Sequence, residues 1–211
     1  RRPRQAELAA LMPEKLPPTL VFMNAFGRSL RFGGRRMDEI MLNWWSGTTC
    51  RIFGIRLEPT GTPEPGPVLI VANHISWLDS QLLHSVCSMG FVAKAEIADW
   101  PVFGFIARAG GTGFHERGSH DSADEVVVAM QRRLNEGRRV AIFPEGGVKP
   151  GPGISFCRAR LFRAAVEVGC RVQPVMIRYL RDGRVDADVK FRPGETFGAN
   201  LLRRLGRPGC I

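Results

Sequence analysis

The stretch VLIVANHISWLD, Val68 to Asp79, carries the clearest fold signal in this chain of 211 residues. Its opening residues form a continuous apolar run after Pro67, which is typical of a strand buried on both faces of a parallel sheet. The polar residues that follow Ala72 then lie at the carboxyl end of that strand, where α/β proteins build their sites. The stretch therefore predicts an α/β core and a functional position.

His74 and Asp79 are the first candidates for chemistry. A histidine titrates near neutrality and can accept a proton from a hydroxyl. An aspartate at the start of the next helix can return to one ring nitrogen and fix the tautomer, as in a serine-hydrolase triad that lacks its serine. The missing hydroxyl can belong to a substrate. The alternative is a capped helix start with a structurally satisfied histidine.

Strands and helices are expected to alternate along the rest of the chain. Apolar runs predict strands at residues 91–95, 140–143, 172–179 and 185–191. Amphipathic stretches with capping or terminating residues predict helices at 79–86 and 99–109, between Ser122 and Gly137, between Ser155 and Gly169, and near Leu201. This alternation predicts an α/β fold with a mostly parallel sheet flanked by helices.

Residues 1–57 are expected to form a separate, membrane-interacting segment, with a second domain over residues 58–211. Residues 19–26 and a long helix beginning at Met37 predict a helical pair, and arginines lie nearby. The apolar stripe of the long helix either packs on the main domain or contacts a membrane. Its members are Met37, Ile40, Met41, Trp44, Trp45, Thr48, Ile52 and Ile55.

The net charge of +10, from 30 Lys and Arg against 20 Asp and Glu, predicts an anionic partner or a solvated basic surface. No nucleic-acid motif is present, so a membrane surface or a phosphorylated substrate is favoured over nucleic acid. The five cysteines have no metal-ligand spacing, which favours a reduced compartment and no metal site. No apolar run is long enough to span a bilayer.

Three polar segments with glycines follow predicted strands: NHISWLD (73–79), GTGFHERG (111–118) and FPEGG (143–147). The carboxyl ends of parallel strands share one edge of a sheet, so these segments are expected to converge. Arg117 either binds a phosphate or carboxylate with its planar fork or is an exposed surface arginine. Glu145 either accepts hydrogen bonds from loop amides or contacts the substrate directly.

These segments, together with VQPVMIRY (172–179), resemble four sequence blocks of the glycerolipid acyltransferases, NHxxxxD, GxxFIxR, FPEGT and VxPVxxxY. The blocks occur in the family's order and spacing between Val68 and Tyr179. Members of this family acylate lysophosphatidic acid and related lysolipids. The resemblance implies transfer of a fatty acyl group from acyl-CoA or acyl carrier protein to a lysolipid hydroxyl, with the donor as co-substrate and no other cofactor.

The resemblance also implies roles for particular residues. His74 is the expected general base and Asp79 its orienting partner, Arg117 binds the acceptor headgroup, and Lys94 can meet a phosphate. The implied substrate-binding set is Asn73, Ser76, Lys94, Gly113, Phe114, Arg117, Glu145, Gly146, Gly147 and Lys149. The expected location is the cytoplasmic face of the cell membrane, as a peripheral or monotopic protein that contacts an anionic membrane surface.

The chain departs from the family pattern in the third block, which in this family helps to shape the acceptor region. The third block usually continues with a threonine and a basic residue, but here Gly147 and Val148 precede Lys149. ISFCRARLFRAA (154–165) resembles a subgroup that includes lyso-ornithine lipid acyltransferases. The expected acceptor is 1-acylglycerol-3-phosphate, giving phosphatidic acid, with a lyso-ornithine lipid as the alternative. A noncatalytic basic protein that binds membranes is the alternative from another class.

Overall fold

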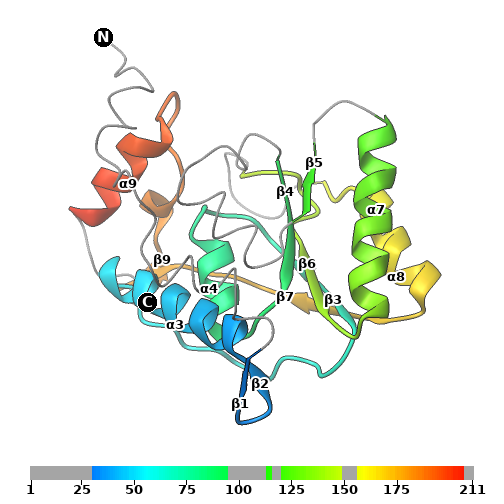
Figure 1. Cartoon of the computed structure of the whole chain (residues 1–211). Coiled ribbons are helices and arrows are strands. Elements are labelled where there is room, and N and C mark those ends of the chain that lie inside the picture. Colours follow the sequence, from blue (N-terminus) through cyan, green and yellow to red (C-terminus); the bar gives the residue numbers. More distant parts are fainter. Residues whose placement is uncertain (1–29, 95–112, 116–119, 149–155, 207–211) are drawn as a thin grey trace, which may run out of the picture.

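The computed structural model describes residues 30–94, 113–115, 120–148 and 156–206, and it is built on a parallel five-stranded sheet (Figure 1). The strand order is β5-β4-β6-β3-β7, and every neighbouring pair is parallel. The bounds are β3 Val68–Ala72, β4 Gly90–Lys94, β5 Gly113–His115, β6 Arg139–Ile142 and β7 Arg171–Val175. The predicted α/β class with a mostly parallel sheet is confirmed.

Helices cover both faces of this sheet, which explains the continuous apolar run of β3. Helices α7 (His120–Asn135) and α8 (Arg163–Val168) lie on one side, and α3 (Met37–Ile52) and α4 (Asp79–Val86) lie on the other (Figure 1). Leu69 packs with residues of α7 and α8 in one cluster of buried side chains. Val68 and Ile70 belong to a second cluster, which contains residues on or directly after α3 and α4. Alternate side chains of one strand therefore supply two cores.

The face that α3 buries is not the predicted apolar stripe. Its buried residues are Asp38, Leu42, Ser46 and Cys50, whereas Trp44 and Ile52 of the stripe are 62% and 61% exposed. Helix α3 packs against α4 through small residues: a Cβ on Gly47 would lie 3.9 Å from the Cβ of Ser85. Close approach of two helices selects small side chains over the bulkiest ones, so α3 packs on the main domain through this face. Membrane contact by the exposed part of the stripe, the other role considered for it, stays a prediction.

The other helical predictions need smaller corrections. Helix α7 begins two residues before Ser122, so Ser122 is not its N-cap. The predicted helix after Ser155 is a 3-10 turn, η1 (Ala159–Phe162), followed by the short helix α8, which ends at Gly169 in the left-handed conformation (φ +70). Residues 19–26 and 99–109, predicted as helical, lie outside the described part of the chain. No described helix is long and apolar enough to cross a membrane.

The last two predicted strands are also shorter than expected. After β7 the chain forms a small antiparallel hairpin, β8 (Leu180–Arg181) with β9 (Arg184–Val185), and a second small hairpin, β1 (Arg31–Phe32) with β2 (Arg35–Arg36), precedes α3. Residues 185–191 alternate like a strand, but the Asp186 side chain accepts the Asp188 N–H and starts a 3-10 turn, η2 (Ala187–Val189). Helix α9 (Phe197–Leu205) matches the helix predicted near Leu201.

Candidate active site

The candidate site is centred on His74, which follows β3 at the carboxyl edge of the sheet. Nδ1 of its ring lies 2.8 Å from Oδ2 of Asp79, the first residue of α4. The His74 side chain is 19% exposed, whereas Asp79 is fully buried. With Asp79 as the acceptor, Nδ1 carries the ring proton, and Nε2 is the nitrogen that can accept a proton from a substrate.

Asp79 is held by donors on both of its carboxylate oxygens. Oδ2 also accepts the main-chain N–H groups of Ile75 and Ser76, at 2.6 and 2.9 Å. Oδ1 accepts the hydroxyl of Tyr179 at 2.7 Å. These donors satisfy both oxygens of the buried carboxylate, so Asp79 faces the imidazole in one fixed orientation. The local NHISWLD turn and a distant tyrosine together fix the pair.

Glu145 fixes the main chain of His74. It is 4% exposed, and its Oε1 accepts the His74 N–H at 2.8 Å. This contact follows from the sheet order, because β6 lies next to β3 and FPEGG leaves β6 beside NHISWLD. The predicted convergence of these two segments is confirmed. Of the two roles considered for Glu145, the structure shows the bond to a loop amide.

The ring plane of His74 is set by an aromatic stack. Phe143, the first residue of FPEGG, stacks on His74 with centroids 4.1 Å apart and an interplanar angle of 11°. Phe91 of β4 stacks in turn on Phe143, with ring centroids 5.5 Å apart. Stacking on one face and the bond at Nδ1 restrict both rotations of the imidazole, which orients Nε2.

The other predicted residues of the first and third blocks have structural contacts. Both amide atoms of Asn73 bond the main chain of Ile177, at 2.7 and 3.0 Å, which ties the ends of β3 and β7 together. Ser76 is fully buried, and its Oγ accepts the Leu78 N–H. Gly146 has φ +72 and donates its N–H to Phe143, and Gly147 has φ +148. Contact of these residues with substrate remains a prediction.

The second block runs through the edge strand β5, which together with β4 lies on the opposite side of β6 from β3. Lys94 ends β4 and pairs with His115, and Gly113 and Phe114 belong to β5, the edge strand. Their backbone thus ends at the same sheet edge as β3 and β6. Arg117 and Lys149 lie outside the described residues, so their headgroup roles remain predictions. Among the described residues, no group of three His, Cys, Asp or Glu gathers as a metal site.

Sequence reasoning missed three supporting side chains. Tyr179 stands in the fourth block and Phe143 in the third, so the motifs contained both, but nothing in their spacing indicated contact with the dyad. Trp77 of NHISWLD donates Nε1–H to Oδ1 of Asn200 in α9 at 3.1 Å, and its ring packs edge-on against Phe197. No local sequence signal connects Asn200 with Trp77, because they are 123 residues apart.

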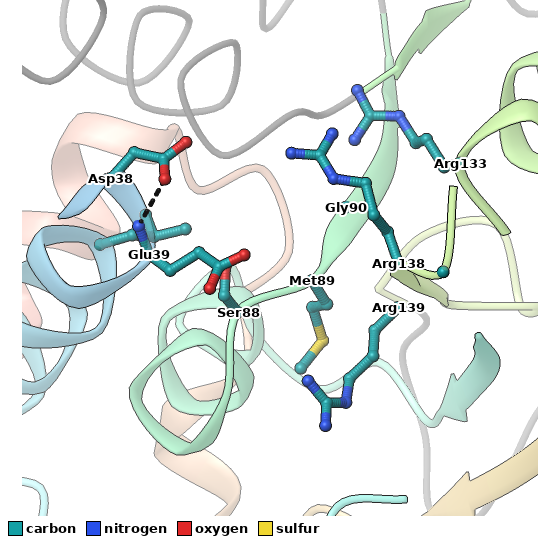
Figure 2. Close-up of a pocket in the computed structure, with 10 residues that line it drawn as sticks. Asp38, Glu39, Ser88, Met89, Gly90, Arg133, Arg138 and Arg139 are labelled. Carbon is teal, nitrogen blue, oxygen red and sulfur yellow. Dashed lines mark hydrogen bonds between the residues drawn. The ribbon is translucent and has the colours of Figure 1, made fainter. Parts of the chain in front are cut away.

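A separate pocket lies at the amino ends of β4 and β6, on the edge of the sheet opposite His74. Figure 2 shows Asp38 and Glu39 on one side of it and Arg133, Arg138 and Arg139 on the other. Arg138 pairs with Glu136 at 3.7 Å, and Arg139 donates to the main chain of Glu64. This pocket shares no residue with the dyad, so the candidate site is the His74 edge.

An open α/β fold with a buried carboxylate behind a histidine at the strand ends is the arrangement of a hydroxyl-activating enzyme. The profile of the Acyltransferase family matches residues 56–178, more than half of the chain. The chain therefore belongs to the Acyltransferase family. This finding confirms the family that the four blocks indicated.

The relatives carry two kinds of name. The chain is 37% identical to the lyso-ornithine lipid O-acyltransferase of Pseudomonas aeruginosa, over 81% of this chain and 64% of the relative. It is 32% identical to the enzyme of the same name from Brucella abortus, over 98% and 79%. It is 35% identical to the 1-acyl-sn-glycerol-3-phosphate acyltransferase of Neisseria gonorrhoeae, over 60% and 50%. The chain thus spans about half to two thirds of the first and third of these relatives.

The fold is also similar to a solved structure. The crystal structure of the 1-acyl-sn-glycerophosphate acyltransferase PlsC from Thermotoga maritima superposes with a TM-score of 0.60 and 20% sequence identity. The similarity covers 77% of this chain and 67% of that one. At this identity the likeness concerns the fold, which agrees with the parallel sheet and flanking helices described above.

Proposed function

We propose that this protein is an O-acyltransferase that moves a fatty acyl group from a thioester donor, acyl-CoA or acyl carrier protein, to the hydroxyl of a lysolipid. The observation that carries the proposal is the 2.8 Å contact between His74 Nδ1 and the buried Asp79, at the sheet edge of a chain that belongs to the Acyltransferase family. The partly exposed imidazole can reach a substrate, while its acidic partner stays out of water.

The geometry supports a direct transfer. Nε2 of His74 takes the proton from the acceptor hydroxyl, and the oxygen attacks the thioester carbonyl. The C–O bond forms as the tetrahedral oxyanion appears, and the C–S bond then breaks. The imidazolium returns its proton to the departing thiolate, so the enzyme ends as it began. Asp79 stabilises the imidazolium during this cycle, and no covalent acyl-enzyme is needed.

The acceptor is a lysolipid of one of two kinds. The relatives named lyso-ornithine lipid O-acyltransferase match up to 98% of this chain, whereas the Neisseria glycerol-phosphate relative matches 60%. The departure at Gly147 and Val148 points in the same direction. It replaces the threonine hydroxyl usual in the family, and it moves the basic residue one position further along, to Lys149. We therefore put the lyso-ornithine lipid first and lysophosphatidate, which the motifs alone favoured, second.

We also propose that the protein acts at an anionic membrane surface. A lysolipid acceptor resides in membranes, and the net charge of +10 favours anionic lipids. Helix α3 presents Trp44 and Ile52 to solvent, and the hairpin before it presents Phe32, which is 74% exposed. Exposed Arg31, on the hairpin, and Arg51, on α3, accompany these apolar side chains. An aromatic and basic surface of this kind suits the lipid interface.

The test is an acyl-transfer assay on the purified chain in detergent micelles, with acyl-CoA and acyl carrier protein as donors. Lyso-ornithine lipid and lysophosphatidate are offered at matched concentration and salt, and mass spectrometry identifies the product. His74→Ala should lower turnover at least about a hundredfold. His84→Leu, which removes a buried histidine outside the dyad, should retain activity at neutral pH. Transfer that survives His74→Ala in a folded protein would refute the mechanism.

A further inference from the structure

Tyr179 is the last residue of the fourth block, directly after the residues 56–178 that the family profile matches, and it contacts the dyad. It follows β7, and its hydroxyl donates to Oδ1 of Asp79 at 2.7 Å. Both residues are withdrawn from water, since Tyr179 is 2% exposed and Asp79 is fully buried. The two carboxylate oxygens therefore serve different partners: Oδ2 faces the imidazole and the loop amides, and Oδ1 faces the phenol.

The C-terminal part of the chain holds Tyr179 in place. The main-chain N–H of Asp186, after β9, donates to the carbonyl of Tyr179 at 2.8 Å. Arg204 of α9 is 1% exposed and lies 3.7 Å from the Asp186 carboxylate. The phenol is thus positioned by charged groups in the interior. Helix α9 also contacts the catalytic loop, because Trp77 bonds Asn200 and packs edge-on against Phe197.

We propose that Tyr179 is a positioning residue that fixes Asp79 and lowers the proton affinity of His74; this inference rests on the proposed role of His74 as the base. A hydroxyl that donates to a carboxylate withdraws part of its charge, so the imidazolium next to it is stabilised less. The same bond prevents Asp79 from rotating away from the ring.

The phenol is suited to be a permanent donor. Burial and the Asp79 charge hold the pKa of Tyr179 well above its ordinary value, so the hydroxyl keeps its proton throughout the range in which His74 titrates. Within the described residues, Glu145 bonds the main chain of His74, and Arg204 and the thiol of Cys50 act electrostatically on the phenol. Burial raises the pKa of Cys50 to about 11, so this thiol is neutral in that range.

The chain contains a single tyrosine, so a tyrosine analogue incorporated during expression changes the hydroxyl at this position alone. Replacing all tyrosine with a ring-fluorinated tyrosine strengthens the donor at position 179 and nowhere else, while Tyr179→Phe removes it. The imidazole pKa of His74 is read by NMR on protein with isotope-labelled histidine, with His74→Ala for assignment. The pH dependence of kcat/KM is measured on the same three proteins. Fluorine NMR checks that the analogue stays protonated.

The expected shifts have opposite signs. The pKa of His74 and the acidic limb of the kcat/KM profile should move up by about one unit in Tyr179→Phe, which lowers activity about tenfold below that pKa. Both should move down with the fluorinated residue. A purely structural role would not give this reversal. Unchanged His74 titration in both proteins would overturn the inference.

The outcomes separate this inference from the proposed function. If acyl transfer depends on His74 but no titration shifts occur, the inference fails and the function stands. If no acyl transfer is found, the NMR titration still decides the effect of Tyr179 on His74. Should Tyr179→Phe fail to fold, the fluorinated protein, which preserves the hydroxyl and nearly the same shape, gives the deciding measurement.

Discussion

Acid should destabilise this protein through His84, a buried histidine of α4. Its side chain is 5% exposed, and Nδ1 has no hydrogen-bond partner among the described residues. Its ring packs edge-on against Phe91, with centroids 4.9 Å apart. Burial therefore lowers the pKa of His84 from 6.5 to about 4 in the folded state. Protonation of this imidazole therefore lowers the stability of the folded protein.

The direction and size of this loss of stability follow from the difference between the pKa of His84 in the folded and unfolded states. As the pH falls through 6.5, the unfolded chain binds a proton at this position, whereas the folded protein does not until the pH is near 4. The contribution of His84 to stability is therefore complete above 6.5 and is lost progressively between 6.5 and 4. At about pH 4.5 the loss amounts to about 2 to 3 kcal/mol, a sizeable part of the stability of an ordinary domain.

The assay is urea denaturation of wild type and His84→Leu at several pH values between about 7.5 and 4.5. Leucine fills similar space and cannot titrate, so the free energy of unfolding of the variant should fall less as the pH decreases. The difference between the two proteins should change by about 2 to 3 kcal/mol in favour of the variant. Parallel pH curves for wild type and His84→Leu would refute the reasoning.

Two further predictions concern the FPEGG turn and the lipid surface. Gly146→Ala should destabilise the protein by about 1 to 2 kcal/mol and reduce acyl transfer, because φ is +72 and a Cβ would lie 3.2 Å from Nε of Arg158. Gly137→Ala, at φ +74 in open space, is the thermal-unfolding control, and equal effects on acyl transfer would contradict a site-specific role. Trp44→Ala should weaken binding to anionic vesicles in a sedimentation assay, whereas Val166→Ala, which removes an even more exposed apolar side chain from α8, should not. Unchanged binding of Trp44→Ala would exclude this face of α3 from the membrane contact.

Helix α3 shows which features a sequence pattern can predict and which depend on packing. The periodicity of residues 37–55 correctly predicted a helix, because the main-chain hydrogen bonds of a helix are local. Which face it buries depends on the partner helix, and α4 approaches closely at Gly47. The apolar pattern therefore left the partner of Trp44 open between the main domain and a membrane, and the structure shows this side chain exposed.

The amino-acid sequence by itself determined the strand at Val68–Ala72, the α/β class and the His74–Asp79 pair. These features depend on short-range spacing: a two-sided apolar run, and a turn that returns Asp79 to the ring before it. The tertiary structure alone decided the partners of the pair. Glu145 is 71 residues from His74, and Tyr179 is 100 residues from Asp79. Strand order and parallel register, set by the packing of the whole sheet, bring these side chains to one edge, and no local pattern contains that information.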